Sequence, residues 1–320
     1  MAVDLSKVLV IGISSRALFD LDAEDRIFKT QGLQAYSQFQ RENEDVSLNP
    51  GTAFHLIKSI LRLNARDRAK RRVEVIMMSQ NNADAGLRIF KSIKHHSLDI
   101  TRGAFTSGAS ISPYLQAFNV DLFLSADDRD VQDAVDAGVA AARIYHLPSD
   151  FNPRTNQIRI AFDGDAVIFS DQSEKIFQNH GLDEFKWHEQ EHANEPLSEG
   201  PFAKLLRTIA TLQKELSDKE NSPIRIALIT ARDAPAHERI IRTLRAWEIR
   251  IDEMFFMGGV AKTKIVEAFS PHIFFDDQDV HVQPASVKVP SALVPYRTGP
   301  KKNHLSPHKP YSESHANSTT

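Results

Sequence analysis

The sequence predicts an α/β protein built from two tandem units, each with a mainly parallel sheet. Short apolar runs alternate along the chain with segments of helical periodicity, which is typical of parallel strands joined by helices on both faces of a sheet. The two halves of the chain also resemble each other in sequence. At 320 residues the chain is long for one hydrophobic core, whereas two units of about 150 residues fit the usual domain size.

Apolar or β-branched runs predict the strands, at 7–13, 73–78, 121–124, 157–162, 225–229, 254–257 and 272–275. Helical patterns separate most of these runs, for example at 83–94, 131–142, 234–246 and 262–269. Polar, helix-prone sequence interrupts the alternation at 34–70 and 183–222. The strands and helices therefore alternate as expected for parallel sheets.

The resemblance between the halves has a fixed spacing. The segment IFKTQGL at 27–33 lies 149 positions before IFQNHGL at 176–182, and Gly51 keeps this spacing with Gly200. Further along, the spacing becomes 151, and a two-residue loop insertion near 218–222 accounts for the change. We therefore expect an internal duplication. The expected parts are a unit over 1–150, a second unit over 151–297 and a disordered tail over 298–320, which is too polar to form a core.

One apolar run ends in two carboxylates, Asp163 and Asp165, with Gly164 between them. A carboxylate at a strand end can act as the nucleophile of phosphoryl transfer, because an aspartyl-phosphate divides one difficult displacement into two easier ones. A second carboxylate nearby can protonate the leaving oxygen and then deprotonate the attacking water. Taken alone, however, Asp-Gly-Asp is also a common turn sequence.

Further candidates follow at or just beyond predicted strand ends: Thr230, Lys262, and Asp276 with Asp277. Thr230 would donate its hydroxyl to a phosphoryl oxygen, and Lys262 would neutralise the charge of nucleophile and phosphate. The acidic pair, with the two aspartates of the first motif, would supply the oxygen ligands that Mg²⁺ prefers. A helix cap or a solvated strand end could explain each of them separately. Their joint order at strand ends favours one phosphotransfer site.

This order of motifs, Asp-x-Asp, Thr, Lys and Asp-Asp on a Rossmann-like sheet, resembles the haloacid-dehalogenase-type (HAD-like) phosphatases. The segments that resemble the type I cytosolic 5′-nucleotidases more narrowly are SRALFD at 15–20, FDGDAV at 162–167, TAR at 230–232 and PHIFFDDQ at 271–278. The resemblance implies Mg²⁺-dependent hydrolysis of nucleoside 5′-monophosphates to nucleoside and phosphate. It also implies small caps or flaps after the nucleophile strand, for which 34–70 and 183–222 are the candidates.

The first half lacks these chemical groups. In the places of Asp163, Asp165, Thr230, Lys262, Asp276 and Asp277 it holds Ser14, Arg16, Ser79, Ile111, Ser125 and Ala126. Of these six side chains, only Thr230 has a counterpart with the same group, the hydroxyl of Ser79. We therefore predict that the first half is a non-catalytic copy and that catalysis belongs to the second half alone.

A nucleotide substrate also needs a contact to its base. A flap aromatic such as Phe169, Phe177 or Trp187 could stack on it, although each is also typical of an ordinary core residue. Arg232 is a candidate contact to phosphate or ribose, and Arg16 is another candidate near the boundary of the halves. The sequence does not indicate which base is preferred. Two other functions stay open: a phosphatase for a sugar phosphate or another small monoester, and an inactive nucleotide-binding scaffold.

Composition excludes several classes of protein. The net charge of −3, from 39 basic and 42 acidic residues, gives no positive field for nucleic acid or an anionic membrane. The chain has no cysteine, which excludes disulfides and thiolate chemistry. The apolar run near residue 10 is too short for a secretory signal, and no stretch approaches the ~18 apolar residues of a membrane span. We expect a cytoplasmic protein that binds a small molecule, as a monomer or a homo-oligomer.

Overall fold

The computed structural model describes residues 4–67, 70–153, 157–216 and 222–297. Its centre is one ten-stranded sheet in the order β3-β2-β1-β4-β5-β10-β9-β6-β7-β8. The strands are β1 (Leu9–Ile13), β2 (Val73–Ser79), β3 (Arg102–Phe105), β4 (Leu122–Ser125), β5 (Ala141–Ile144), β6 (Ile158–Phe162), β7 (Ile224–Thr230), β8 (Glu253–Phe256), β9 (Ile273–Asp276) and β10 (Ser291–Leu293). The predicted tail at 298–320 lies outside the described residues, as does most of the predicted insertion near 218–222.

The strand directions divide the sheet into two halves. Neighbouring strands pair in parallel on both sides, and only β5 and β10 pair antiparallel. Read from its own outer edge, each half has the same order, β3-β2-β1-β4-β5 and β8-β7-β6-β9-β10. The predicted α/β class with a mostly parallel sheet is confirmed. Because β10 runs against β5, the carboxyl ends of the strands in the two halves lie at opposite edges of the sheet.

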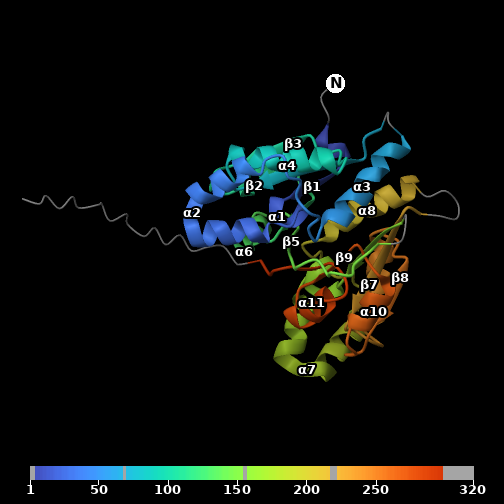
Figure 1. Cartoon of the computed structure of the whole chain (residues 1–320). Coiled ribbons are helices and arrows are strands. Elements are labelled where there is room, and N and C mark those ends of the chain that lie inside the picture. The colour runs from blue at the N-terminus through green and yellow to red at the C-terminus, as the bar shows by residue number, and fades with distance from the viewer. Residues whose placement is uncertain (1–3, 68–69, 154–156, 217–221, 298–320) are drawn as a thin grey trace, which may run out of the picture.

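Helices connect the strands and cover the sheet (Figure 1). In the first half they are α1 (Ser15–Leu18), α2 (Asp22–Glu42), α3 (Phe54–Leu61), α4 (Ala83–His95), α5 (Ser112–Ala117) and α6 (Asp128–Asp136). In the second half they are α7 (Gln172–Glu191), α8 (Ala203–Leu216), α9 (His237–Ala246), α10 (Thr263–Phe269) and α11 (Asp279–Ser286). Short non-α turns complete the set, at η1 (Leu5–Lys7), η2 (Arg62–Arg66) and η3 (Gly164–Ile168).

Two predictions about these elements are wrong. The helix predicted over 131–142 ends at Asp136, because Gly138 adopts a φ of 84° and turns the chain into β5, whose Ala141 and Ala142 are buried. The segments 34–70 and 183–222 are not flaps throughout. Their later parts form α3 and α8, whose apolar side chains are buried in the main core. Among the described residues, α2 and α7 project from the body of the protein (Figure 1).

Both projecting helices are broken at a glycine in a left-handed conformation, Gly32 with a φ of 82° and Gly181 with a φ of 84°. Residues that carry a Cβ atom adopt this backbone conformation with difficulty, so glycine is favoured there. The break brings aromatic rings together edge to face. In α7 the ring centroids of Phe177 and Phe185 lie 6.2 Å apart, with an interplanar angle of 81°. In α2 the centroids of Phe28 and Tyr36 lie 5.8 Å apart, with an interplanar angle of 79°.

The hydrophobic core continues across both halves. Side chains from β1, β2, β6 and β7 form one buried cluster with those of α3 and α8. Figure 1 draws these two helices where the two halves of the protein meet. Lys204 of α8 forms an ion pair of 2.8 Å with Asp121 of the first half, and Lys70 pairs with Glu215 at 2.7 Å. The continuous sheet and core therefore hold the second half in a fixed position against the first.

Candidate active site

The Asp-Gly-Asp motif lies where β6 ends. The backbone N–H of Asp163 donates to the carbonyl of Phe275 in β9, which fixes Asp163 at the carboxyl edge of the second half. The chain then makes a tight turn in which Ala166 has a φ of 59°. A Cβ atom at Gly164 would lie 3.3 Å from the Thr230 hydroxyl oxygen, so a side chain here would need Thr230 to shift slightly. The ends of β6 and β7 therefore lie close together, with Gly164 against Thr230.

Lys262 joins two of the predicted acidic residues. Its Nζ atom lies 2.8 Å from Asp163 Oδ1 and 2.7 Å from Asp276 Oδ2, and its side chain is only 2% exposed. Burial alone would lower the pKa of Lys262, but the two adjacent carboxylates outweigh burial and raise it. Lys262 is therefore a permanent cation between the two aspartates.

Asp163, Asp276 and Asp277 form a buried acidic trio, with one oxygen of each carboxylate within 4.8 Å of the others. Burial is the largest cause that raises the pKa of all three carboxyls, to about 7 for Asp277. Tyr296 donates a hydrogen bond to Asp277 Oδ2, whereas Asp277 Oδ1 is buried without a hydrogen-bond partner among the described residues. A trio of oxygen donors with one unsatisfied acceptor fits a hard divalent cation. The trio could therefore hold a metal ion.

Thr230 and Arg232 come from the end of β7. Thr230 is buried at the strand end beside the Asp163 turn, and its hydroxyl accepts a hydrogen bond of 3.3 Å from the Arg232 N–H. The Arg232 guanidinium donates two hydrogen bonds to Asp165, of 2.7 and 2.6 Å, and a third to Glu189 on α7. Asp165, which we had expected among the metal ligands, is thus bound to Arg232 and stays outside the acidic trio.

Comparison with known proteins identifies the family of this chain. A family model described as 5′-nucleotidase matches residues 1–301. The chain belongs to the 5′-nucleotidase family. The human protein Cytosolic 5′-nucleotidase 1B is 37% identical over 286 residues, which cover 87% of this chain and 47% of the human protein. The chain thus spans about half the length of this curated relative. No solved structure matches the chain significantly.

The aromatic candidates of this 5′-nucleotidase family member differ in their positions. Phe169 is fully buried and packs against Trp247 with centroids 5.6 Å apart, so it cannot stack on a ligand and that expectation is corrected. Phe177 on α7 is 43% exposed, and Trp187 is 57% exposed. Phe185 is not among the residues predicted from the sequence, yet its ring lies under the Arg232 guanidinium at 5.3 Å. Its spacing of eight positions from Phe177 on one helix was the available signal.

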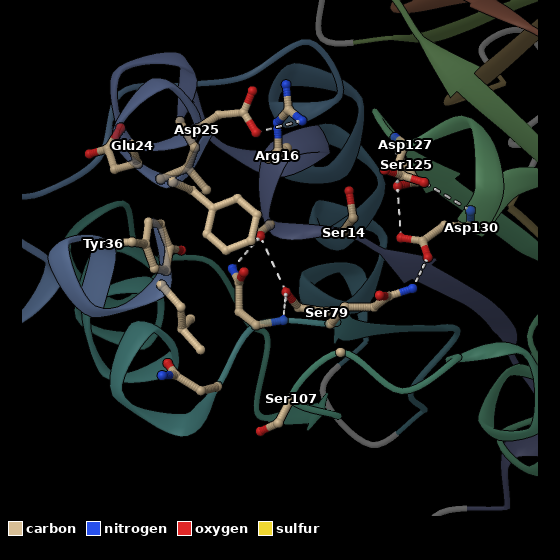
Figure 2. A pocket seen from close by; sticks show the side chains of 18 residues that line it. Ser14, Arg16, Glu24, Asp25, Tyr36, Ser79, Ser107, Ser125, Asp127 and Asp130 are labelled. Carbon is tan, nitrogen blue, oxygen red and sulfur yellow. Dashed lines mark hydrogen bonds and ion pairs between the residues drawn. The ribbon is translucent and has the colours of Figure 1, made fainter. Parts of the chain in front are cut away.

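Arg16 does not lie at this site. Arg16 follows β1, at the carboxyl ends of the strands of the first half. Because β5 and β10 pair antiparallel, these strand ends lie at the opposite edge of the sheet from Asp163. There Arg16 forms an ion pair of 3.2 Å with Asp25 (Figure 2). The expectation that Arg16 contacts the same substrate is therefore corrected, because sequence alone did not reveal the reversal of direction between the halves.

Glu189 was also missed. Its carboxylate is fully buried and accepts hydrogen bonds from Arg232, from Arg239 at 3.0 Å and from Ser173 at 2.9 Å. Burial alone would raise the pKa of Glu189, but Arg232 and its other donors outweigh burial and lower it. In the sequence Glu189 belongs to a polar helix and suggests only a solvated face. In the structure it connects α7 to the Arg232 that holds Asp165.

Proposed function

We propose that this protein is a Mg²⁺-dependent 5′-nucleotidase that hydrolyses nucleoside 5′-monophosphates to nucleoside and phosphate. The observation that carries the proposal is the contact of buried Lys262 with both Asp163 and Asp276, beside Asp277. A nucleophile, a fixed cation and a set of metal ligands are the parts that phosphoryl transfer requires. The family match and the name of the human relative support the substrate class.

The proposed mechanism has two displacements. The Asp163 carboxylate attacks phosphorus, and the bond from phosphorus to the ribose 5′ oxygen breaks as Asp165 gives that oxygen a proton. Asp165 then takes a proton from water, the water oxygen attacks phosphorus, and the bond to Asp163 breaks to release phosphate. Thr230 and Lys262 would bind the phosphoryl oxygens during both steps. Mg²⁺, held by Asp163, Asp276 and Asp277, would neutralise charge that develops on those oxygens.

Helix α7 is the proposed nucleoside flap. Phe177 is exposed at the break of this helix and Phe185 lies against Arg232, so the two rings lead from solvent toward the catalytic groups. Stacking of a base on exposed Phe177 would direct the 5′ phosphate toward Asp163. Arg232 acts in this proposal as a positioning residue, because its bonds go to Asp165 and Glu189.

We further propose that the HAD-like units over 1–150 and 151–297 arose by internal duplication. Support comes from the common strand order and from repeated contacts at the sequence spacing. Arg88 donates to the Val46 carbonyl as Arg239 donates to the Glu195 carbonyl, at 3.0 and 2.9 Å. The name of the human relative also suggests a cytosolic protein. None of the helices of the described residues could span a membrane.

The test is a phosphate-release screen over nucleoside monophosphates and sugar phosphates, with and without Mg²⁺. Asp163→Asn should abolish release while circular dichroism shows an intact fold, because the amide keeps the volume but removes the nucleophile. Asp45→Asn, at an exposed aspartate of the first half, is the matched control and should retain full activity. Faster release from sugar phosphates would favour the other phosphatase class, and no release from any monoester would favour a binding scaffold.

A further inference from the structure

The first half contains a cavity of about 400 Å³ at the carboxyl ends of β1, β2 and β4 (Figure 2). Cavities of this size hold small organic ligands. It lies under α2, as the catalytic groups of the second half lie beside α7. Figure 2 shows Ser14 and Ser79 on one side of the cavity and Tyr36 on another. The catalytic mechanism makes no use of this space.

We propose that the cavity is a second binding site, which takes an uncharged nucleoside. The choice of a nucleoside rests on the proposed function, because hydrolysis of the substrate releases a nucleoside. The cavity itself, its wall and its charge are observed independently of that function.

The wall of the cavity offers a surface for a base. Phe28 and Tyr36 of α2 meet edge to face, with centroids 5.8 Å apart, and Leu33 lines the cavity beside them. This repeats the geometry of Phe177 and Phe185 in the proposed nucleoside flap. Phe28 is 48% exposed and Leu33 is 59% exposed, although both are large and apolar. A stacked base would cover them.

The floor of the cavity offers hydrogen bonds to neutral groups. Ser15 Oγ lies 3.4 Å from Ser79 Oγ and accepts a hydrogen bond of 3.2 Å from the Asn81 amide. Ser14 also lines the floor, at the place that Asp163 occupies in the second half. Hydroxyl and amide groups both donate and accept, so they match sugar hydroxyls and the edge of a base.

The charges of the cavity disfavour a phosphate. Arg16 is the only cationic side chain among its described lining residues, and it is ion-paired with Asp25 at 3.2 Å and with Asp22 at 4.0 Å. Asp127 and Asp130 are further carboxyl groups of the lining. Ile111, at the place of Lys262, is buried in a separate apolar cluster and supplies no charge. A phosphate dianion would therefore meet acidic groups without a free cation, whereas a neutral nucleoside would not.

The experiment counts bound ligands in the full-length chain. Adenosine, inosine, cytidine and uridine are titrated by calorimetry, and AMP is titrated into Asp163→Asn to prevent turnover. Two nucleosides should bind per chain. Phe28→Ala, through the loss of a stacking contact, and Leu33→Glu, through a charge placed on the apolar wall, should each weaken one site by at least about 10-fold and leave kcat/KM for the monophosphate within about twofold of wild type.

Phe177→Ala and Leu182→Glu are the matched variants in the second half and should weaken the other site and raise KM. Photolabelling with 8-azidoadenosine identifies the part of the chain that contacts the nucleoside in the second site. The labelled tryptic peptide should be 30–41, which contains Leu33 and Tyr36.

Binding of one nucleoside that Phe177→Ala weakens and Phe28→Ala does not would overturn the second site. AMP that binds the first half as tightly as adenosine would overturn the selection for an uncharged ligand. Two bound nucleosides in a chain that releases no phosphate from any monophosphate would instead contradict the proposed function and leave the second site standing.

Discussion

Replacement of Lys262 tests the centre of the proposed mechanism. Lys262→Met keeps most of the side-chain length but removes the charge that lies 2.8 Å from Asp163 and 2.7 Å from Asp276. The cation should stabilise the charge that moves from Asp163 to the phosphoryl oxygens. We expect kcat to fall by a factor on the order of 10², with a smaller change in KM.

The magnitude follows from the distance. At 2.8 Å and an effective dielectric constant of about 20, the attraction between two unit charges is about 6 kcal/mol. In the transition state the phosphoryl oxygens add negative charge beside Lys262, and we take the attraction gained only there as roughly half of this value, about 3 kcal/mol. Each 1.36 kcal/mol changes the rate about tenfold, which gives the factor on the order of 10².

The assay is steady-state phosphate release at saturating Mg²⁺, with circular dichroism to verify that each variant is folded. Lys264→Met is the matched control, since Lys264 lies on the same helix with its side chain exposed. Ser14→Ala, at the place of Asp163 in the first half, should also leave kcat nearly unchanged. A folded Lys262→Met protein with kcat within about fivefold of wild type would refute the electrostatic role of Lys262.

Three further predictions concern the metal, Arg232 and His272. Excess EDTA should stop phosphate release, and added Mg²⁺ should restore it. Ca²⁺ should restore release poorly, because Ca²⁺ accepts a looser coordination geometry. Full activity in excess EDTA would exclude a role of the metal. Arg232→Lys should lower kcat at least about 10-fold, because lysine cannot form the two parallel bonds to Asp165, and an unchanged kcat would mean that Asp165 needs no such support. Burial lowers the pKa of His272 from 6.5 to about 4. Between pH 6.5 and 4 the unfolded chain therefore binds more protons than the folded protein. The free energy of unfolding falls as the pH falls through this range. Urea titrations should show that His272→Gln loses roughly 3 kcal/mol of this pH dependence relative to wild type, whereas exposed His146→Gln should not; parallel curves would contradict the assignment.

Local patterns in the sequence were sufficient for the elements that carry the proposed chemistry. The apolar runs at 157–162 and 272–275 predict β6 and β9, because buried parallel strands need apolar side chains on both faces. Asp163 and Asp276 stand at strand ends, where parallel sheets bind ligands, so their proximity was predictable. The short strands β3, β5 and β10 were missed, because runs of three or four residues with alanine, glycine or serine have no clear periodicity.

The sequence by itself determined the α/β class, the repeat spacing and the residues that meet at the acidic trio, because these depend on local periodicity and on strand ends. Only the tertiary structure decided what depends on strand direction and on burial. The antiparallel pairing of β5 with β10 separates Arg16 from Asp163. Packing buries Phe169 in the core and brings Glu189 of α7 to Arg232 of the β7 end. Such contacts join residues whose positions along the chain carry no common pattern, and so they follow only from how the helices pack on the sheet.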